Sequence, residues 1–171
     1  MNTVGLDLSL TSTGYSVLGE TGSINGTKLR GPERLIVIRE KVRSLIEPLA
    51  SPVVAIEGYS FGSKNSQAHA TGELGGVVRV LLHELNVPYV EIPPTCRSKF
   101  ATGKGNAGKS EVVSAISAKT GIIWTGSGAD DMCDAWILEE MIRVKLNIGQ
   151  FDWPKLNKDA LDKIDWTSFN L

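Results

Sequence analysis

The chain has 171 residues, which is enough for one domain with a substantial hydrophobic core. Its 42% hydrophobic and 22% charged content is typical of a globular protein and excludes a disordered or fibrous chain. No apolar run is long enough to span a bilayer, and the formal net charge of −1 argues neither for nor against a nucleic-acid partner. Cys96 and Cys133 lie far apart, and the N-terminus has no secretory pattern, so we expect a cytoplasmic protein with reduced thiols.

Residues 4–17 have the pattern of a β-hairpin, with an apolar first strand, a turn rich in small and hydroxyl side chains, and a second strand. Asp7 is the unusual residue, because a carboxylate within an apolar strand is costly to bury unless it is paired or binds a metal ion. Two interpretations remain open for Asp7. Either it is a metal ligand, or it anchors the turn through the hydroxyl of Ser9, Thr11 or Ser12.

The rest of the chain alternates between strand and helix patterns. In chain order it predicts a short strand within 21–29, a helix over 31–48, a strand at 53–56, a helix over 66–86, a strand at 87–92, and helices at 95–100, 109–119 and 129–146. An antiparallel hairpin followed by strands that alternate with helices predicts an α/β fold with a mixed five-stranded sheet flanked by helices. We expect a main domain over 1–148 and a tail over 149–171 that packs on the body or on a partner.

Three further acidic residues occur in contexts that can bring them to Asp7. Glu57 ends the apolar strand at 53–56. Asp131 and Asp134 are three residues apart on a predicted helix, so their β-carbons lie about 5–6 Å apart on one face, where like charges repel unless a cation lies between them. Asp130 competes for this position, since it is four residues from Asp134, and acids in a first helical turn are also favoured by the helix dipole alone. Oxygen ligands of this kind suit Mg²⁺ or Mn²⁺.

A basic strip without acids covers residues 97–109, and a local positive strip can contact phosphates or be ordinary solvated surface. Its members are Arg97, Lys99, Lys104 and Lys109. The loop after Glu57 contains Tyr59 and Phe61, which either pack in the core or stack on an unpaired base.

Residues 103–110 match the P-loop pattern G-x-x-x-x-G-K-[ST] letter for letter. A P-loop should follow a buried strand, whereas the segment before this one begins with Pro93-Pro94 and is basic. We therefore expect no nucleotide cofactor. The glycines and lysines can still contact a phosphate, and that phosphate can belong to DNA.

Together these segments resemble the RuvC family of Holliday-junction resolvases in the RNase H-like superfamily, and phage-type members in particular. The resemblance covers about residues 3–147. It rests on Gly5-Leu6-Asp7-Leu8-Ser9 with Thr13-Gly14-Tyr15, on Ile56-Glu57, on Asp131-Met132-Cys133-Asp134-Ala135, and on the stretch from Pro94 to Lys109.

The resemblance implies an RNase H-like fold and a metal-dependent endonuclease of branched DNA. It implies that Asp7, Glu57, Asp131 and Asp134 are catalytic and metal-binding, with two Mg²⁺ or Mn²⁺ ions per site, about 3.5–4 Å apart. It selects Asp131 over Asp130. It also implies that the enzyme leaves 5′-phosphate and 3′-hydroxyl ends on the cut DNA.

By the same resemblance, Lys104 and Lys109 lie near the scissile phosphate, Tyr59 or Phe61 contacts the junction, and the 66–86 helix forms a homodimer interface. Gly72, Gly75 and Gly76 on that helix permit close helix approach, either between subunits or within one. A catalytically inactive junction-binding module is the alternative function, and a P-loop nucleotide-binding protein is a further one.

Overall fold

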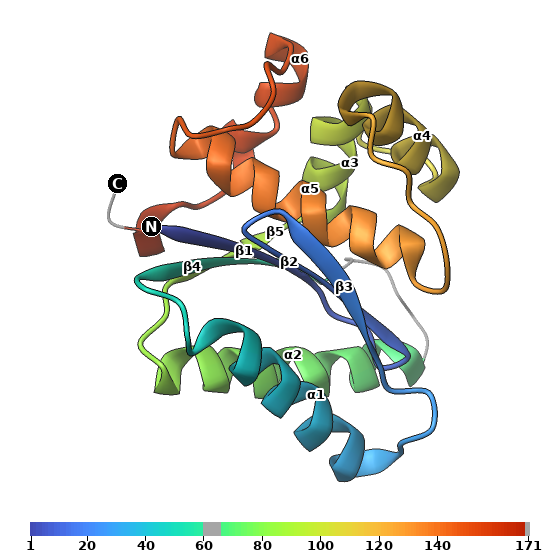
Figure 1. The fold of residues 1–171 in the computed structure, drawn as a ribbon, viewed down its shortest axis with the longest axis vertical. Helices are drawn as coiled ribbons and strands as arrows, with labels where there is room; N and C mark the ends of the chain where they lie inside the picture. The colour runs from blue at the N-terminus through green and yellow to red at the C-terminus, as the bar shows by residue number, and fades with distance from the viewer. Residues whose placement is uncertain (60–65, 170–171) are drawn as a thin grey trace.

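A computed structural model describes residues 1–59 and 66–169, with the backbone alone for 66–71, and these residues build one mixed sheet with helices on both faces (Figure 1). The strand order is β3-β2-β1-β4-β5. The strands are β1 (Asn2–Asp7), β2 (Ser12–Val17), β3 (Glu20–Asn25), β4 (Pro52–Glu57) and β5 (Tyr89–Ile92). The first three form an antiparallel meander, and β4 and β5 each run parallel to their neighbour, so the expected mixed α/β sheet is confirmed.

The helices lie in two layers that enclose the sheet (Figure 1). One layer contains α1 (Gly31–Ile46) and α2 (Ser66–Glu84), and the other contains α3 (Pro94–Thr102), α4 (Lys109–Thr120) and α5 (Ala129–Lys145). A short helix α6 (Lys155–Lys158) and two 3₁₀ turns, Leu161–Lys163 and Thr167–Phe169, follow. In the part of the chain described here, no helix is long and apolar enough to cross a membrane.

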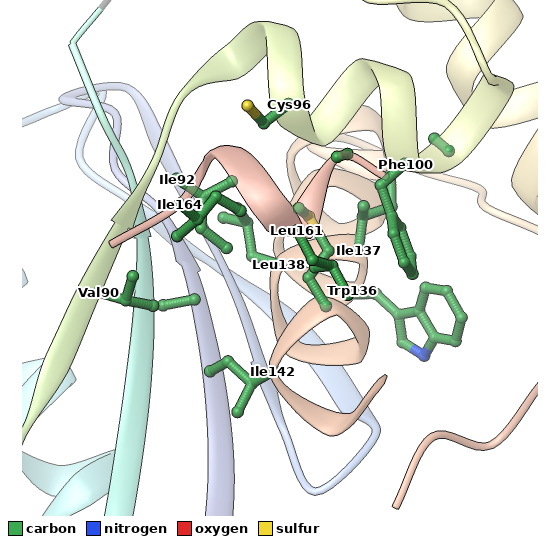
Figure 2. Packing of buried hydrophobic residues seen from close by; sticks show 14 of the residues in the cluster. Val90, Ile92, Cys96, Phe100, Trp136, Ile137, Leu138, Ile142, Leu161 and Ile164 are labelled. Carbon is green, nitrogen blue, oxygen red and sulfur yellow. The ribbon is translucent and has the colours of Figure 1, made fainter. Parts of the chain in front are cut away.

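Strand alternation divides the buried side chains between two cores. Val54 and Ile56 of β4 point into the core beneath α1 and α2, whereas Val53 and Ala55 point into the core beneath α5. A strand that is buried on both faces has a continuous apolar sequence, which is why this segment was recognisable as a strand. Figure 2 shows the second core, where side chains of β5, α3, α5 and the C-terminal segment pack together.

The segment after residue 149 packs against the main body. Trp153 is buried, and its ring centroid lies 4.4 Å from that of Phe100 on α3. Its indole Nε1 donates a hydrogen bond to Glu140 of α5, which also accepts one from the backbone N–H of Gln150 at 3.1 Å. Ser168 donates a hydrogen bond to the carbonyl oxygen of Tyr89 at 2.6 Å, so the segment also reaches β5, the last strand of the sheet.

Two local features can be compared with the expectations from the sequence. The short strand expected within 21–29 is β3, which ends at Asn25, where the Asn25 side chain accepts a hydrogen bond from the Thr27 N–H and the chain turns. The P-loop-like stretch 103–110 joins α3 to α4, so a helix precedes it, as the sequence predicted, where a P-loop requires a strand.

Candidate active site

The carboxyl ends of the two central parallel strands place two acids side by side. In the β1–β4 ladder Leu6 lies opposite Ile56, so the next residues, Asp7 and Glu57, leave the sheet at the same edge. Among the described residues, no hydroxyl of the 8–12 turn donates a hydrogen bond to Asp7. The turn is stabilised internally instead, with the Thr13 hydroxyl donating to the Ser9 carbonyl at 2.6 Å. These contacts do not support the interpretation of Asp7 as a turn anchor.

Helix α5 crosses directly over β1 and β2, and two glycines make this approach possible. A β-carbon at Gly5 would overlap the carbonyl of Ala135, and one at Gly14 would overlap the backbone of Asp131. Only glycine allows such close approach of helix to strand. The first turns of α5 are therefore held against the sheet edge that contains Asp7.

The aspartates of α5 divide between two environments. Asp134 is buried and Asp131 is partly exposed, and both raise the pKa of Asp7 through repulsion. Asp130 instead accepts a hydrogen bond from Lys109 Nζ at 2.7 Å, which lowers the pKa of Asp130 and raises that of Lys109. This arrangement supports the choice of Asp131 over Asp130.

Arg97 is buried, which the sequence did not indicate. It was expected in an exposed basic strip, but its side chain is only 10% exposed and points into the acidic cluster. Its Nε donates to Glu57 and its Nη1 donates to Asp134. A buried arginine needs such partners, because an unpaired charge in the interior is strongly unfavourable.

Burial is the largest cause of the electrostatic shifts in this cluster. It raises the pKa of Asp7 well above its ordinary value, and the charges of Glu57 and Asp134 raise it further, while Arg97 lowers it. Burial raises the pKa of Asp134 to about 7 despite the opposing attraction of Arg97. The pKa of Glu57 is also raised by burial, against the effect of Arg97. Three acids, Glu57, Asp134 and Asp7, share the charge of Arg97, so the site attracts further positive charge.

The donor chemistry of the cluster fits a hard divalent cation, since all four side chains offer carboxylate oxygens. In the part of the chain described, however, no three histidine, cysteine, aspartate or glutamate side chains are arranged to hold one metal ion together. The contacts of Arg97 give a physical reason, because its guanidinium already pairs with two of the four carboxylates, those of Glu57 and Asp134.

The candidate DNA-contacting residues differ in exposure. Lys104 and Lys109 have side chains that are each 68% exposed, and Lys104 pairs with Glu111 at 3.1 Å. Lys99 on α3 is partly buried. Tyr59 is 44% exposed, and Phe61 lies outside the described residues.

Tyr59 is held against α2 by three contacts. Its hydroxyl accepts a hydrogen bond from Arg79 Nη1 at 2.6 Å and donates one to the Gly72 carbonyl at 3.1 Å. The Arg79 guanidinium carbon also lies 4.7 Å from the ring centroid. A β-carbon at Gly75 would overlap the Tyr59 hydroxyl, so Gly75 serves packing within the monomer.

A sheet of order 3-2-1-4-5, with acids at the ends of its central strands and on a helix that crosses them, defines a protein of the RNase H-like fold. Comparison with solved structures agrees. The chain superimposes on Thermus thermophilus RuvC with a TM-score of 0.66 and 21% identity, over 86% of this chain and 98% of that one. It matches T. thermophilus RuvC in complex with a Holliday junction substrate equally well, with a TM-score of 0.66.

The family model described as crossover junction endodeoxyribonuclease RuvC matches residues 3–136. The RuvC of Synechococcus sp. (strain WH7803) is 30% identical over 145 residues, which cover 79% of this chain and 93% of the relative. That of Chloroflexus aggregans is 26% identical over 145 residues, covering 79% and 88%. The chain belongs to the RuvC family.

Proposed function

We propose that this protein is a divalent-metal-dependent endonuclease that resolves branched DNA, with the four-way junction as its main substrate. The observation that carries the proposal is the convergence of Asp7, Glu57, Asp131 and Asp134 at one edge of the sheet, in a chain of the RuvC family. The T. thermophilus relative with the same fold has been solved with a Holliday junction. We expect the enzyme to act in the cytoplasm.

The carboxylates have distinct environments for a common task. Asp7 ends a strand that neighbouring strands hold on both sides, and so serves as the fixed ligand. Glu57 and Asp134 approach it from β4 and α5, and Asp131 approaches from the open side. One or two Mg²⁺ or Mn²⁺ ions held by this set would activate water and stabilise the leaving oxygen, giving 5′-phosphate and 3′-hydroxyl ends.

The phosphate backbone needs cations outside the carboxylate cluster. Lys104 and Lys109 are exposed on the loop and helix start of α4, where Lys109 pairs with Asp130 of α5 and Lys104 pairs with Glu111 of α4. In a complex with DNA, phosphates would replace these acids as the partners of Lys104 and Lys109. Lys99, on the adjoining helix α3, is a further candidate for phosphate contact. Tyr59, two residues after Glu57, is 44% exposed, and the ring face that Arg79 does not cover offers a stacking surface for an unpaired base.

We also propose that the protein works as a homodimer, because a two-fold symmetric junction needs two nicks and one site makes one. An apolar groove of about 650 Å³ between α1 and α2 is the surface that we propose for the dimer interface. Ile36 and Val80 at this groove are 58% and 56% exposed, and a β-carbon at Gly76 would meet open space. Two such faces packed together would bury the groove.

Sedimentation of the free protein and of Val80→Glu tests the dimer. The wild type should sediment as a dimer and Val80→Glu as a monomer, while Ile148→Glu, which changes an apolar residue that is 54% exposed beyond the end of α5, should leave the dimer intact. A wild-type monomer, with and without junction DNA, would rule out this assembly. Gly75 is unsuited to this test, since its replacement would disturb Tyr59 within the monomer.

Incubation with labelled four-way junctions, Y-junctions, flaps and linear duplexes, in Mg²⁺ and in Mn²⁺, tests the activity. We expect paired nicks on opposite strands of the four-way junction and little cutting of linear duplex. Preferred cutting of Y-junctions or flaps would correct the substrate, and the absence of cutting of any DNA in either metal would refute the proposal.

A further inference from the structure

Arg97 connects two of the proposed metal ligands that come from different parts of the fold. It lies on α3, whereas Glu57 ends β4 and Asp134 lies on α5. Nitrogen Nε donates to Glu57 Oε2, and Nη1 donates to Asp134 Oδ1. The planar guanidinium can make both contacts at once, which the single ammonium group of a lysine does less well.

In the part of the chain that the structure describes, few other cations lie close to Glu57 and Asp134, which makes their contacts with Arg97 important. Lys109, the other cation close to these acids, is mostly exposed and pairs with Asp130. Among the described residues, Arg97 is thus the cation that touches the proposed ligand set directly. Its side chain is 10% exposed and that of Asp134 is 6% exposed, so water screens the interaction weakly.

We propose that Arg97 is the internal counter-ion of the carboxylate cluster, and that it gives up Glu57 and Asp134 when a divalent cation binds. The proposal rests on the proposed function of the cluster as a metal site. It assigns Arg97 a positioning role in which the guanidinium stabilises the acids in the absence of metal and lowers their affinity for metal.

The change in metal affinity on removing Arg97 has opposite signs for a counter-ion and for a residue that only supports the structure. If Arg97 merely held the ligands in place, its removal would loosen the site and weaken metal binding. If Arg97 competes for the same oxygens, its removal frees two carboxylates and metal binding becomes tighter. The direction of the change in affinity therefore separates the two roles, independently of any effect on cleavage.

The test is calorimetric titration of Mg²⁺ and Mn²⁺ into the wild type, Arg97→Gln and Arg97→Lys. Thermal denaturation of each protein is measured in parallel, in EDTA and in about 10 mM Mg²⁺. Arg43→Gln is the matched control, because Arg43 also pairs with several glutamates, Glu40 at 3.3 Å among them, but lies on α1 across the sheet. It should leave metal affinity unchanged.

For Arg97→Gln we expect metal affinity to rise about tenfold or more (about 1.4 kcal/mol). Its melting temperature should fall in EDTA and recover more than that of the wild type on adding metal. Arg97→Lys should lie between the two, and it decides the question if Arg97→Gln does not fold. Unchanged or weaker metal binding by these variants, with normal binding by the wild type, overturns the counter-ion role and leaves the proposed nuclease standing. If the wild type binds neither metal at millimolar concentration, the metal site itself is refuted, and the role of Arg97 with it.

Discussion

Asp134→Asn should make the protein more stable in the absence of metal while abolishing cleavage. Asp134 is buried beside Glu57 and Asp7, and burial raises its pKa from 3.8 to about 7 even with Arg97 in contact. A carboxyl group with a raised pKa in the folded state favours folding when protonated, and this contribution is lost as the pH rises through about 7. At pH 8 the charged form therefore opposes folding.

The size of the effect follows from that shift. A rise of roughly three units corresponds to about 4 kcal/mol, at about 1.4 kcal/mol per unit. Because neighbouring acids share the same repulsion, we expect a gain of about 1–4 kcal/mol for the uncharged, nearly isosteric asparagine. In a domain of this size that is an increase in melting temperature of roughly 3–10 °C.

Thermal denaturation in EDTA at pH 8 and at pH 5 measures this directly. The gain should be largest at pH 8 and less than half as large at pH 5, where Asp134 of the wild type is protonated in the folded state but mostly ionised in the unfolded chain. Asp130→Asn is the control, since the hydrogen bond from Lys109 lowers the pKa of Asp130 and its charge is favourable. It should not stabilise the protein at either pH. A variant Asp134→Asn that melts below the wild type at pH 8, or gains equally at both pH values, would refute the reasoning.

Three further predictions follow from the same geometry. Asp131→Asn should reduce junction cleavage far more than Asp130→Asn, and equal losses would mean that the two aspartates have been assigned wrongly. Lys104→Ala and Lys109→Ala should each weaken junction binding and lower the slope of log affinity against log salt by about one, whereas ATP hydrolysis lost with Lys109→Ala would revive the P-loop interpretation. Mg²⁺ affinity should rise between pH 6 and 8, around the pKa of about 7 for Asp134, with protons released on binding, and a flat pH profile in calorimetry would contradict this.

The sequence predicted most of the fold because its signals there are local. The apolar run before Glu57 and the helical spacing of 129–146 fix a strand and a helix, and the crossover topology then brings their acids to one edge. The order of these pieces was enough to indicate the family, to which the chain does belong.

The arrangement of side chains around the site could not be predicted in the same way. Arg97 lies in a short helix whose sequence does not fix which face is buried, so its charge indicated surface. Its inward direction depends on how α3 packs against α5 and on two acids distant in the sequence. The roles of Gly5 and Gly14 under α5 are likewise tertiary, because they depend on a helix more than 100 residues away.

Anchoring of the C-terminal segment was also hidden from sequence reasoning. Glu140 and Trp153 pair through a hydrogen bond of 3.1 Å that neither residue signals alone. A glutamate on a helix is usually exposed. Glu140 is buried because its carboxylate accepts hydrogen bonds from three donors of the C-terminal segment, the backbone N–H groups of Gln150 and Phe151 and the indole of Trp153. The aromatic residues beyond 149 indicated packing, but not the partner.

Cleavage of a labelled four-way junction in Mg²⁺ by the wild type and by Asp7→Asn, with junction binding measured in parallel, tests the central claim most directly. Asp7 lies on the central strand at the edge where the carboxylates meet, and the substitution preserves its shape while removing its charge. We expect paired nicks by the wild type, no detectable nicks by Asp7→Asn, and similar junction affinity for both. Cleavage by Asp7→Asn at a rate close to that of the wild type would contradict the assignment of this carboxylate cluster as the active site.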